Sequence, residues 1–280
     1  MFTLPKIPIG SWVNSIVEWA RIELKPVFDI ITVIIEFLVS GFRDTLMLIH
    51  PIILIIIVMA LVWWIASRKV AIGTALGLLL AYNLQLWEPS ITTFALVLSS
   101  TVLALIVGLP LGIWTARSEV AHKLIMPLLD FMQTMPPFVY LIPAVFFFGI
   151  GNVPGLIATV VFAMPPAIRL TGLGIRQVPE ELVEAADAFG STPGQKLFKV
   201  QLPMALPTIM AGINQVIMLS LSMVVIAAMI GAGGLGAVVL RGIQRLDIAM
   251  GFEGGLAIVI VAIILDRITQ SLTEKRKAKA

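Results

Sequence analysis

The sequence predicts an all-α, polytopic membrane protein with about seven transmembrane helices, preceded by two amphipathic helices at the membrane interface. Of its 280 residues, 59% are hydrophobic and only 12% are charged, whereas about a quarter of the residues of a soluble domain are charged. A hydrocarbon core about 30 Å thick requires roughly 20 apolar residues per helix, and several stretches are long enough. Most charged residues lie outside these stretches.

Residues 1–48 carry polar residues at helical spacing in two runs, which Pro26 separates. The polar positions of Trp12–Lys25 and Val27–Asp44 are Asn14, Glu18, Arg21, Lys25, Asp29, Glu36, Ser40 and Arg43. A span across the membrane would place the acidic residues of the second run in hydrocarbon, which is costly. We therefore predict two exterior amphipathic helices that lie in the interface. They serve either as a simple anchor or as a scaffold or sensor.

Seven later stretches are predicted to span the membrane. They are His50–Ala66, Ala71–Trp87, Ile91–Ala116, Leu124–Ile150, Gly155–Leu173, Met204–Ile230 and Gly251–Ile268. Glycine and proline inside them are tolerated where neighbouring helices or a cavity satisfy the freed backbone groups. The organisation expected is a first hairpin in residues 49–89, a core in residues 90–270 and a basic tail in residues 271–280.

Basic residues are concentrated on one side of the predicted spans. That side holds Arg68, Lys69, Arg117, Lys123, Arg176, Lys196, Lys199, Lys275, Arg276, Lys277 and Lys279. The other side has a turn at Glu88, an uncharged turn at Gly151–Pro154 and a segment with Arg241 and Arg245. Because cytoplasmic loops carry an excess of Lys and Arg, the first side is predicted to be cytoplasmic and residues 1–48 to lie outside.

A polar segment within residues 176–203, "EELVEAADAFGSTPGQKLFKVQLP" from Glu180 to Pro203, interrupts the apolar core. A first helix is predicted with an acidic stripe of Glu180, Glu184 and Asp187 opposite an apolar face of Leu182, Ala185, Ala186 and Phe189. Gly190 is a typical residue just beyond a helix end. Thr192 and Gln195 have the spacing of a capping box, which predicts a second short helix ending at Pro203. The segment is either a docking surface or a stiff connector.

The spacing in this segment resembles the EAA loop of ATP-binding-cassette (ABC) import permeases. Glu184-Ala185-Ala186 is followed after three residues by Gly190 and after nine more by Val200-x-Leu202-Pro203. In that family the loop is the coupling helix, which sits in a cleft of the ATPase subunit. The resemblance therefore implies ATPase coupling through Glu184, Ala185, Ala186, Gly190, Leu202 and Pro203.

Two further stretches narrow the resemblance. "LLDFMQTMPPFVYLIPAVFFFGIG", Leu128–Gly151, is similar to permeases of glycine betaine/proline (quaternary amine, osmoprotectant) uptake systems. "IGAGGLG", Ile230–Gly236, agrees with this, and related methionine and phosphonate permeases carry similar glycine runs. The resemblance covers about Ile91–Ile268. It implies a type I permease of the bacterial cytoplasmic membrane that forms the translocation pathway for a compatible solute such as glycine betaine.

The same resemblance implies the partners of the chain. They are two ABC ATPase subunits that bind ATP-Mg, an extracytoplasmic substrate-binding protein, a second permease copy in a homodimer, and membrane lipid. The chain contains no Gly-x4-Gly-Lys-Ser/Thr sequence and no cysteine, so we predict no P-loop, no catalytic residue and no metal site in it. No nucleic-acid partner is expected. The alternatives are an ATP-independent osmotic channel or secondary transporter, or a membrane scaffold without transport.

Several residues are candidates for the pathway or a gate. Asp130 and Gln133 lie in a proline-rich span, and an acidic residue in a span suggests function, although Asp130 could instead form a cap or an ion pair. Prolines at that depth suggest a broken helix beside a cavity. Asn214 either lines the pathway or bonds between helices. The glycine run either forms an outer gate or permits tight packing; its members are Gly231, Gly233, Gly234 and Gly236.

Overall fold

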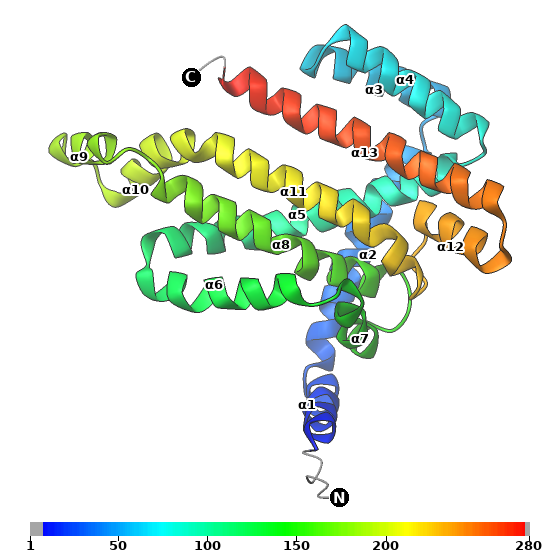
Figure 1. The fold of residues 1–280 in the computed structure, drawn as a ribbon, viewed down its shortest axis with the longest axis horizontal. Coiled ribbons are helices and arrows are strands. Elements are labelled where there is room, and N and C mark those ends of the chain that lie inside the picture. Colours follow the sequence, from blue (N-terminus) through cyan, green and yellow to red (C-terminus); the bar gives the residue numbers. More distant parts are fainter. Residues whose placement is uncertain (1–7, 278–280) are drawn as a thin grey trace, which may run out of the picture.

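The computed structural model describes residues 8–277, and within this range it contains helices and no strand (Figure 1). This confirms the predicted all-α fold class. The helices are α1 Ile9–Glu23, α2 Lys25–Met47, α3 Pro51–Ile65, α4 Arg68–Asn83, α5 Trp87–Arg117, α6 Glu119–Thr134, α7 Pro137–Phe148, α8 Asn152–Arg176, α9 Glu180–Ala188, α10 Pro193–Lys196, the π-helical turn η1 Leu197–Gln201, α11 Leu202–Ala228, α12 Leu235–Arg245 and α13 Ile248–Lys277.

The centre of the molecule is α8, which packs along both α5 and α11. Small residues let these helices approach closely. A Cβ atom added at Gly112 of α5 would lie 2.6 Å from the Cβ of Thr171 in α8, and one added at Gly212 of α11 would lie 3.1 Å from the Cβ of Leu170. Helices in lipid associate mainly through such close packing and through interhelical hydrogen bonds. The glycines therefore stabilise the bundle.

Four helical stretches in the described chain are long and apolar enough to cross a membrane by themselves: α5, α8, the run from α10 through α11, and α13. Two bent pairs, α2 with α3 and α6 with α7, raise the number to six if each pair counts as one span. The residues of the predicted transmembrane hairpin, 49–89, form α3 and α4, which have 15 and 16 residues and pack on one another; that both cross the membrane stays a prediction. The count of seven spans is not confirmed.

The predicted span Leu124–Ile150 is broken into α6 and α7, which are inclined by 100°. The cause is local, because Pro136 and Pro137 remove two consecutive backbone donors and Met135 is held in an extended conformation. The carbonyl of Met132, whose helical partner would be the missing N–H of Pro136, accepts a hydrogen bond from the Tyr140 hydroxyl instead. The prolines thus cause the break in the helix that the sequence predicted.

The two N-terminal helices run steeply across the long helices of the bundle (Figure 1). Helix α2 packs on α5, α7 and α8 and buries Ile35 and Val39 against Leu96, Val153 and Leu156. The acidic residues of α2 remain exposed. The amphipathic pattern is therefore confirmed as two helices, and the apolar face of the second contacts protein.

The turns alternate between the two ends of the bundle, as the charge distribution requires. The α5–α6 turn, α9 and α10 lie toward one end, on the left in Figure 1, together with the later part of α13. The α4–α5 turn and α12 lie toward the other end. The described basic segments assigned to one side of the membrane therefore share one end of the molecule, whereas Lys279 lies outside the described residues; the cytoplasmic location stays a prediction.

Candidate functional site

The end of α9 has the geometry of a Schellman motif. Gly190 has a φ of +71°, its N–H donates to the carbonyl of Asp187 at 2.9 Å, and the N–H of Ser191 donates to the carbonyl of Ala186 at 3.0 Å. Glycine adopts this left-handed conformation without the steric cost that a side chain imposes. No atom lies within 4 Å of a Cβ built at Gly190, so the requirement for glycine comes from the backbone alone. The predicted helix end is confirmed.

The second half of this element is also held by local contacts. The Gln195 N–H donates to the Thr192 hydroxyl at 3.3 Å, and the Thr192 N–H donates to the Gln195 side-chain oxygen at 2.9 Å. These two bonds form the predicted capping box. The Lys196 ammonium contacts the Asp187 carboxylate at 2.8 Å and thereby joins α10 to α9. Together these contacts form a compact helical pair, which we call the coupling element (residues 180–203).

The prediction that the second helix ends at Pro203 was wrong. The chain remains helical without interruption from Pro193 to Ala228. The turn η1 makes this possible because its wider hydrogen-bond pattern, with the Leu202 N–H bonded to the Leu197 carbonyl, accommodates a proline that lacks an N–H. The coupling element is therefore continuous with α11, which packs along the central helix α8.

The family-motif residues divide between an outer and an inner side of the coupling element. Ala186 is buried, and Leu202 packs on a cluster that contains Ile175 and Leu197. Glu184, Ala185 and Pro203 are exposed. Of the predicted apolar face of α9, Ala186 is covered by the rest of the chain, whereas Leu182 and Phe189 are 41% and 91% exposed.

The loop between α11 and α12 is a second unusual region. Gly231 and Gly234 have φ values of +89° and +84°. A Cβ at Gly231 would lie 2.7 Å from Ile150 Cγ2, one at Gly234 would lie 2.5 Å from Thr93 Oγ1, and one at Gly236 would lie 2.2 Å from the Val224 carbonyl oxygen. A side chain at Gly236, in the first turn of α12, would clash with backbone, one at Gly234 would clash with Thr93, and one at Gly231 would require the exposed Ile150 side chain to move.

Gly233 differs from the other three glycines of this loop. Unlike Gly231 and Gly234 it has no positive φ, and unlike all three, a Cβ there would meet its nearest neighbours only at 3.6 Å or more, an ordinary contact. Two side chains that the sequence did not suggest hold the loop. Asn152 accepts a hydrogen bond from the Gly233 N–H at 2.8 Å, and the Thr93 hydroxyl accepts one from the buried Leu235 N–H at 2.8 Å. Both belong to distant helices, so no local sequence signal marked them.

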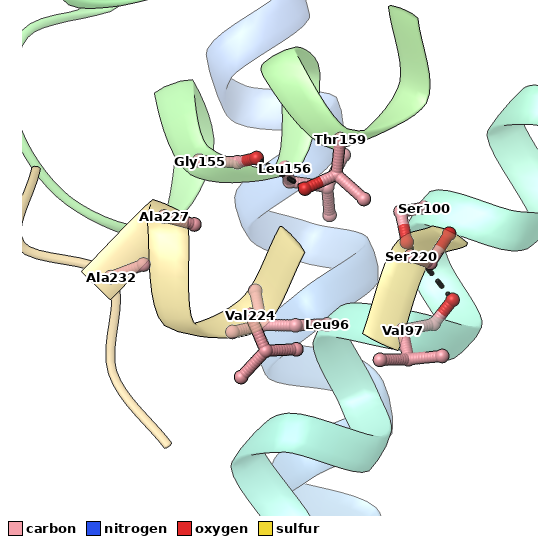
Figure 2. Close-up of a pocket in the computed structure, with 10 residues that line it drawn as sticks. All are labelled: Leu96, Val97, Ser100, Gly155, Leu156, Thr159, Ser220, Val224, Ala227 and Ala232. Atoms are coloured by element: carbon pink, nitrogen blue, oxygen red, sulfur yellow. Dashed lines mark hydrogen bonds between the residues drawn. The ribbon is translucent and has the colours of Figure 1, made fainter. Parts of the chain in front are cut away.

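A small cavity lies beneath the glycine loop, between α5, α8 and α11 (Figure 2). The Thr159 hydroxyl donates to the Gly155 carbonyl and the Ser100 hydroxyl to the Val97 carbonyl, at 2.7 and 3.0 Å. The Ser220 oxygen has no partner within the described chain. The cavity volume is about 20 Å³, enough for about one water molecule. It is too small to be a passage for an organic solute.

The other pathway candidates are distributed over separate contacts. Asp130 forms an ion pair with Arg169 of α8 at 2.8 Å, and a role for it in the pathway stays a prediction. Gln133 is exposed on α6. The Asn214 amide donates to the Asp266 carboxylate of α13 at 3.1 Å, while the Asn214 oxygen is buried without a partner in the described residues. The structure does not bring these side chains together into one site.

Comparisons with known proteins agree with the architecture. A family model described as binding-protein-dependent transport system inner membrane component matches residues 108–277. The glycine betaine transport system permease protein OpuAB of Bacillus subtilis (strain 168) is 52% identical over 279 residues, covering 100% of this chain and 99% of that protein. The glycine betaine/carnitine transport permease protein GbuB of Listeria monocytogenes serotype 1/2a (strain 10403S) is 53% identical over 284 residues, covering all of both chains.

A solved structure gives the same fold at much lower sequence similarity. One chain of an inward-facing MetNI methionine ABC transporter aligns with a TM-score of 0.58 and 22% identity, over 70% of this chain and 96% of that chain. At this identity the likeness concerns the fold alone. From the family match, the whole-length relatives and the shared helical core, the chain belongs to the family of binding-protein-dependent transport system inner membrane components, the permease subunits of ABC transporters.

Proposed function

We propose that this chain is the permease subunit of an ATP-driven importer for glycine betaine or a related quaternary amine. The observation that carries the proposal is the coupling element, a folded helical pair with an uncovered outer face that continues directly into α11. The names of the whole-length relatives, which specify glycine betaine, support the solute class. The chain would be a multi-pass protein of the bacterial cytoplasmic membrane.

The outer face of the coupling element suits a protein partner. Phe189 and Phe198 are 91% and 68% exposed, and Glu184 lies exposed on α9, which Phe189 directly follows. Large aromatic side chains that fill a partner's pocket are typical of binding hot spots, and an adjacent carboxylate gives the contact direction and specificity. An ATPase cleft that receives Phe189 and contacts Glu184 would complete this surface.

Continuity with α11 provides a route from ATP hydrolysis to the pathway. Leu197 and Leu202 anchor the element to the ends of α5 and α8, so a displacement of α9 and α10 would reach three long helices. Two ATPase subunits that bind ATP-Mg would drive the displacement, and two permease copies would form the pathway between them. Inward and outward access would then alternate as two packings of the same helices.

The solute would arrive from an extracytoplasmic binding protein, which would carry most of the specificity. Asp130 and Asp266 are the acidic residues near the pathway candidates, and each already has a partner in this chain. Few charges are thus available to bind a solute strongly, which suits a zwitterion that must be released. Gly231, Gly233, Gly234 and Gly236 would belong to an outer gate.

The proposal is tested by two matched substitutions in the coupling element, Gly190→Asp and Gly194→Asp. Both introduce the same charge, and a Cβ at either position meets open space. Only Gly190 has a positive φ, where a side chain costs about 1–2 kcal/mol. We expect Gly190→Asp to abolish ATPase co-purification or to uncouple ATP hydrolysis from uptake, and Gly194→Asp and Glu184→Lys to have smaller effects.

The assay is uptake of labelled glycine betaine by proteoliposomes that contain the complete complex, with ATPase co-purification measured in parallel. If Gly190→Asp retains its ATPase and transports like the wild type, the coupling element is only a connector. Uptake that proceeds equally without ATP would instead identify a channel or secondary transporter.

A further inference from the structure

A crevice separates α4 of the first hairpin from α13. One face of each helix lines it, at positions i, i+3, i+4 and i+7, and the lining residues are Val70, Gly73, Thr74, Gly77, Ile260, Ile263, Ile264 and Arg267. The helices are in close contact at Gly77, where an added Cβ would lie 2.7 Å from Ile260 Cγ2. At Gly73, one turn earlier in α4, an added Cβ would meet no atom within 4 Å, so the space is open there. The crevice volume is about 210 Å³.

The wall of the crevice is suited to hydrocarbon and unsuited to water. Apart from Thr74 and Arg267, every lining residue is aliphatic or glycine. Water occupies cavities that offer it several polar partners, and an empty apolar space loses the dispersion contacts of its walls. Helix α13 is a candidate membrane span, so lipid acyl chains would be adjacent to the crevice. A protein helix, about 10–12 Å across with its side chains, is too wide for this space.

Basic residues gather at one end of the crevice. The contact of Gly77 with Ile260 sets the register of two antiparallel helices, so Val70, seven residues before Gly77, lies toward Arg267, seven residues after Ile260. Arg68 and Lys69 begin α4 at this same end and are exposed. The four ion pairs found within the described residues involve none of these three basic side chains.

From this arrangement we propose that the α4–α13 crevice binds an anionic phospholipid. An acyl chain lies along Gly73 and Ile263, and the phosphate contacts the guanidinium of Arg267, whose aliphatic stem follows the crevice to the headgroup level. Basic pockets between transmembrane helices recognise anionic headgroups in this way, and guanidinium–phosphate hydrogen bonds are strong. Arg68 and Lys69 add positive potential at the mouth.

A second apolar space lies between the hairpin and the core. It measures about 240 Å³ and lies between α3, α5 and α13, and Ile264 lines both spaces. Apart from the indole of Trp87, its only lining residue with a polar side-chain group is Ser90, which already donates its hydroxyl to the Leu86 carbonyl at 2.6 Å. The bound lipid would therefore be part of the packing that joins α3 and α4 to the core.

The test uses the complete transporter in phosphatidylcholine vesicles with a trace of phosphatidylglycerol that carries a photoactivatable acyl chain. Peptide mapping should place the label on α4 and α13. Gly73→Phe fills the crevice and should remove most of the label, whereas the control Leu76→Phe, at a position outside the crevice where the side chain is 63% exposed, should not. Arg267→Gln keeps the crevice and should lower phosphatidylglycerol labelling about fivefold, the effect of one basic residue near a headgroup.

Thermal unfolding of each variant separates loss of the lipid from loss of the fold. Equal labelling by a phosphatidylcholine probe, or labelling that Gly73→Phe and Arg267→Gln leave unchanged, would overturn the proposal. Cross-links from α4 to a second permease chain would also overturn it, because the crevice would then be a subunit interface. These readouts do not involve glycine betaine or ATP, so they are independent of the proposed transport function.

Discussion

Substitution of Gly234 by alanine should weaken the glycine loop far more than the same substitution at Gly233. Gly234 has φ +84° and ψ −160°, a region that is essentially restricted to glycine and costs other residues about 1–3 kcal/mol. The new Cβ would also lie 2.5 Å from the Thr93 hydroxyl oxygen. That oxygen accepts the hydrogen bond of the Leu235 N–H, and Leu235 is fully buried.

If the Thr93 side chain moves away, the Leu235 N–H loses its partner, which costs about 1–3 kcal/mol for a buried donor. The total loss of stability for Gly234→Ala is therefore about 2–6 kcal/mol. For Gly233→Ala, with ordinary contacts at 3.6 Å or more, we expect a change within about 0.5 kcal/mol. The two variants differ by one position and add the same methyl group, which makes them a matched pair.

The assay is thermal unfolding of the purified permease followed by tryptophan fluorescence, together with glycine betaine uptake by the reconstituted complex. Gly234→Ala should lower the unfolding temperature, by roughly 2–4 °C per kcal/mol, and reduce uptake. Solute binding by the free binding protein should not change. Equal unfolding temperatures for the two variants would refute the packing argument. Normal uptake by a destabilised Gly234→Ala permease would refute the role of this loop as a gate.

Three further predictions concern the fold and its orientation. Tyr140→Phe removes the hydrogen bond that the Met132 carbonyl accepts across the α6–α7 bend. It should lower the free energy of unfolding by about 1–3 kcal/mol, and an unchanged unfolding temperature would contradict this. Gly112→Val places a Cβ 2.6 Å from the Cβ of Thr171 and should lower the free energy of unfolding by about 1–3 kcal/mol through the α5–α8 contact. Thermal unfolding measures this as well, and wild-type stability would show that the two helices can move apart without cost. Because the chain has no cysteine, Ala20→Cys can be labelled alone, and an impermeant maleimide should reach it in intact cells; labelling only after the inner face is opened would reverse the predicted orientation.

The features that sequence alone predicted correctly depend on neighbours within about one helical turn. The end of α9 at Gly190 and the capping box of Thr192 with Gln195 are hydrogen-bonded between residues at most five apart. The break at Pro136 follows from two missing backbone donors. Composition determined that the chain is a helical membrane protein, because a soluble domain could not cover so much apolar surface.

Other features were decided only by the tertiary structure, because they depend on partners far away in the chain. Gly233 and Gly234 are adjacent and look alike in the sequence, yet only Gly234 lies against Thr93, more than 140 residues earlier. The pairing of Asp130 with Arg169 and the uncovered position of Phe189 likewise follow from how whole helices are placed.

The sequence thus determined the fold class, the local helix ends and the position of the coupling element. The tertiary structure decided which glycines have no room for a side chain, that the coupling element continues into α11, and where spaces remain between helices. The physical reason is that backbone hydrogen bonds and proline effects act over a few residues, whereas steric exclusion and cavities arise only when distant segments are brought into contact.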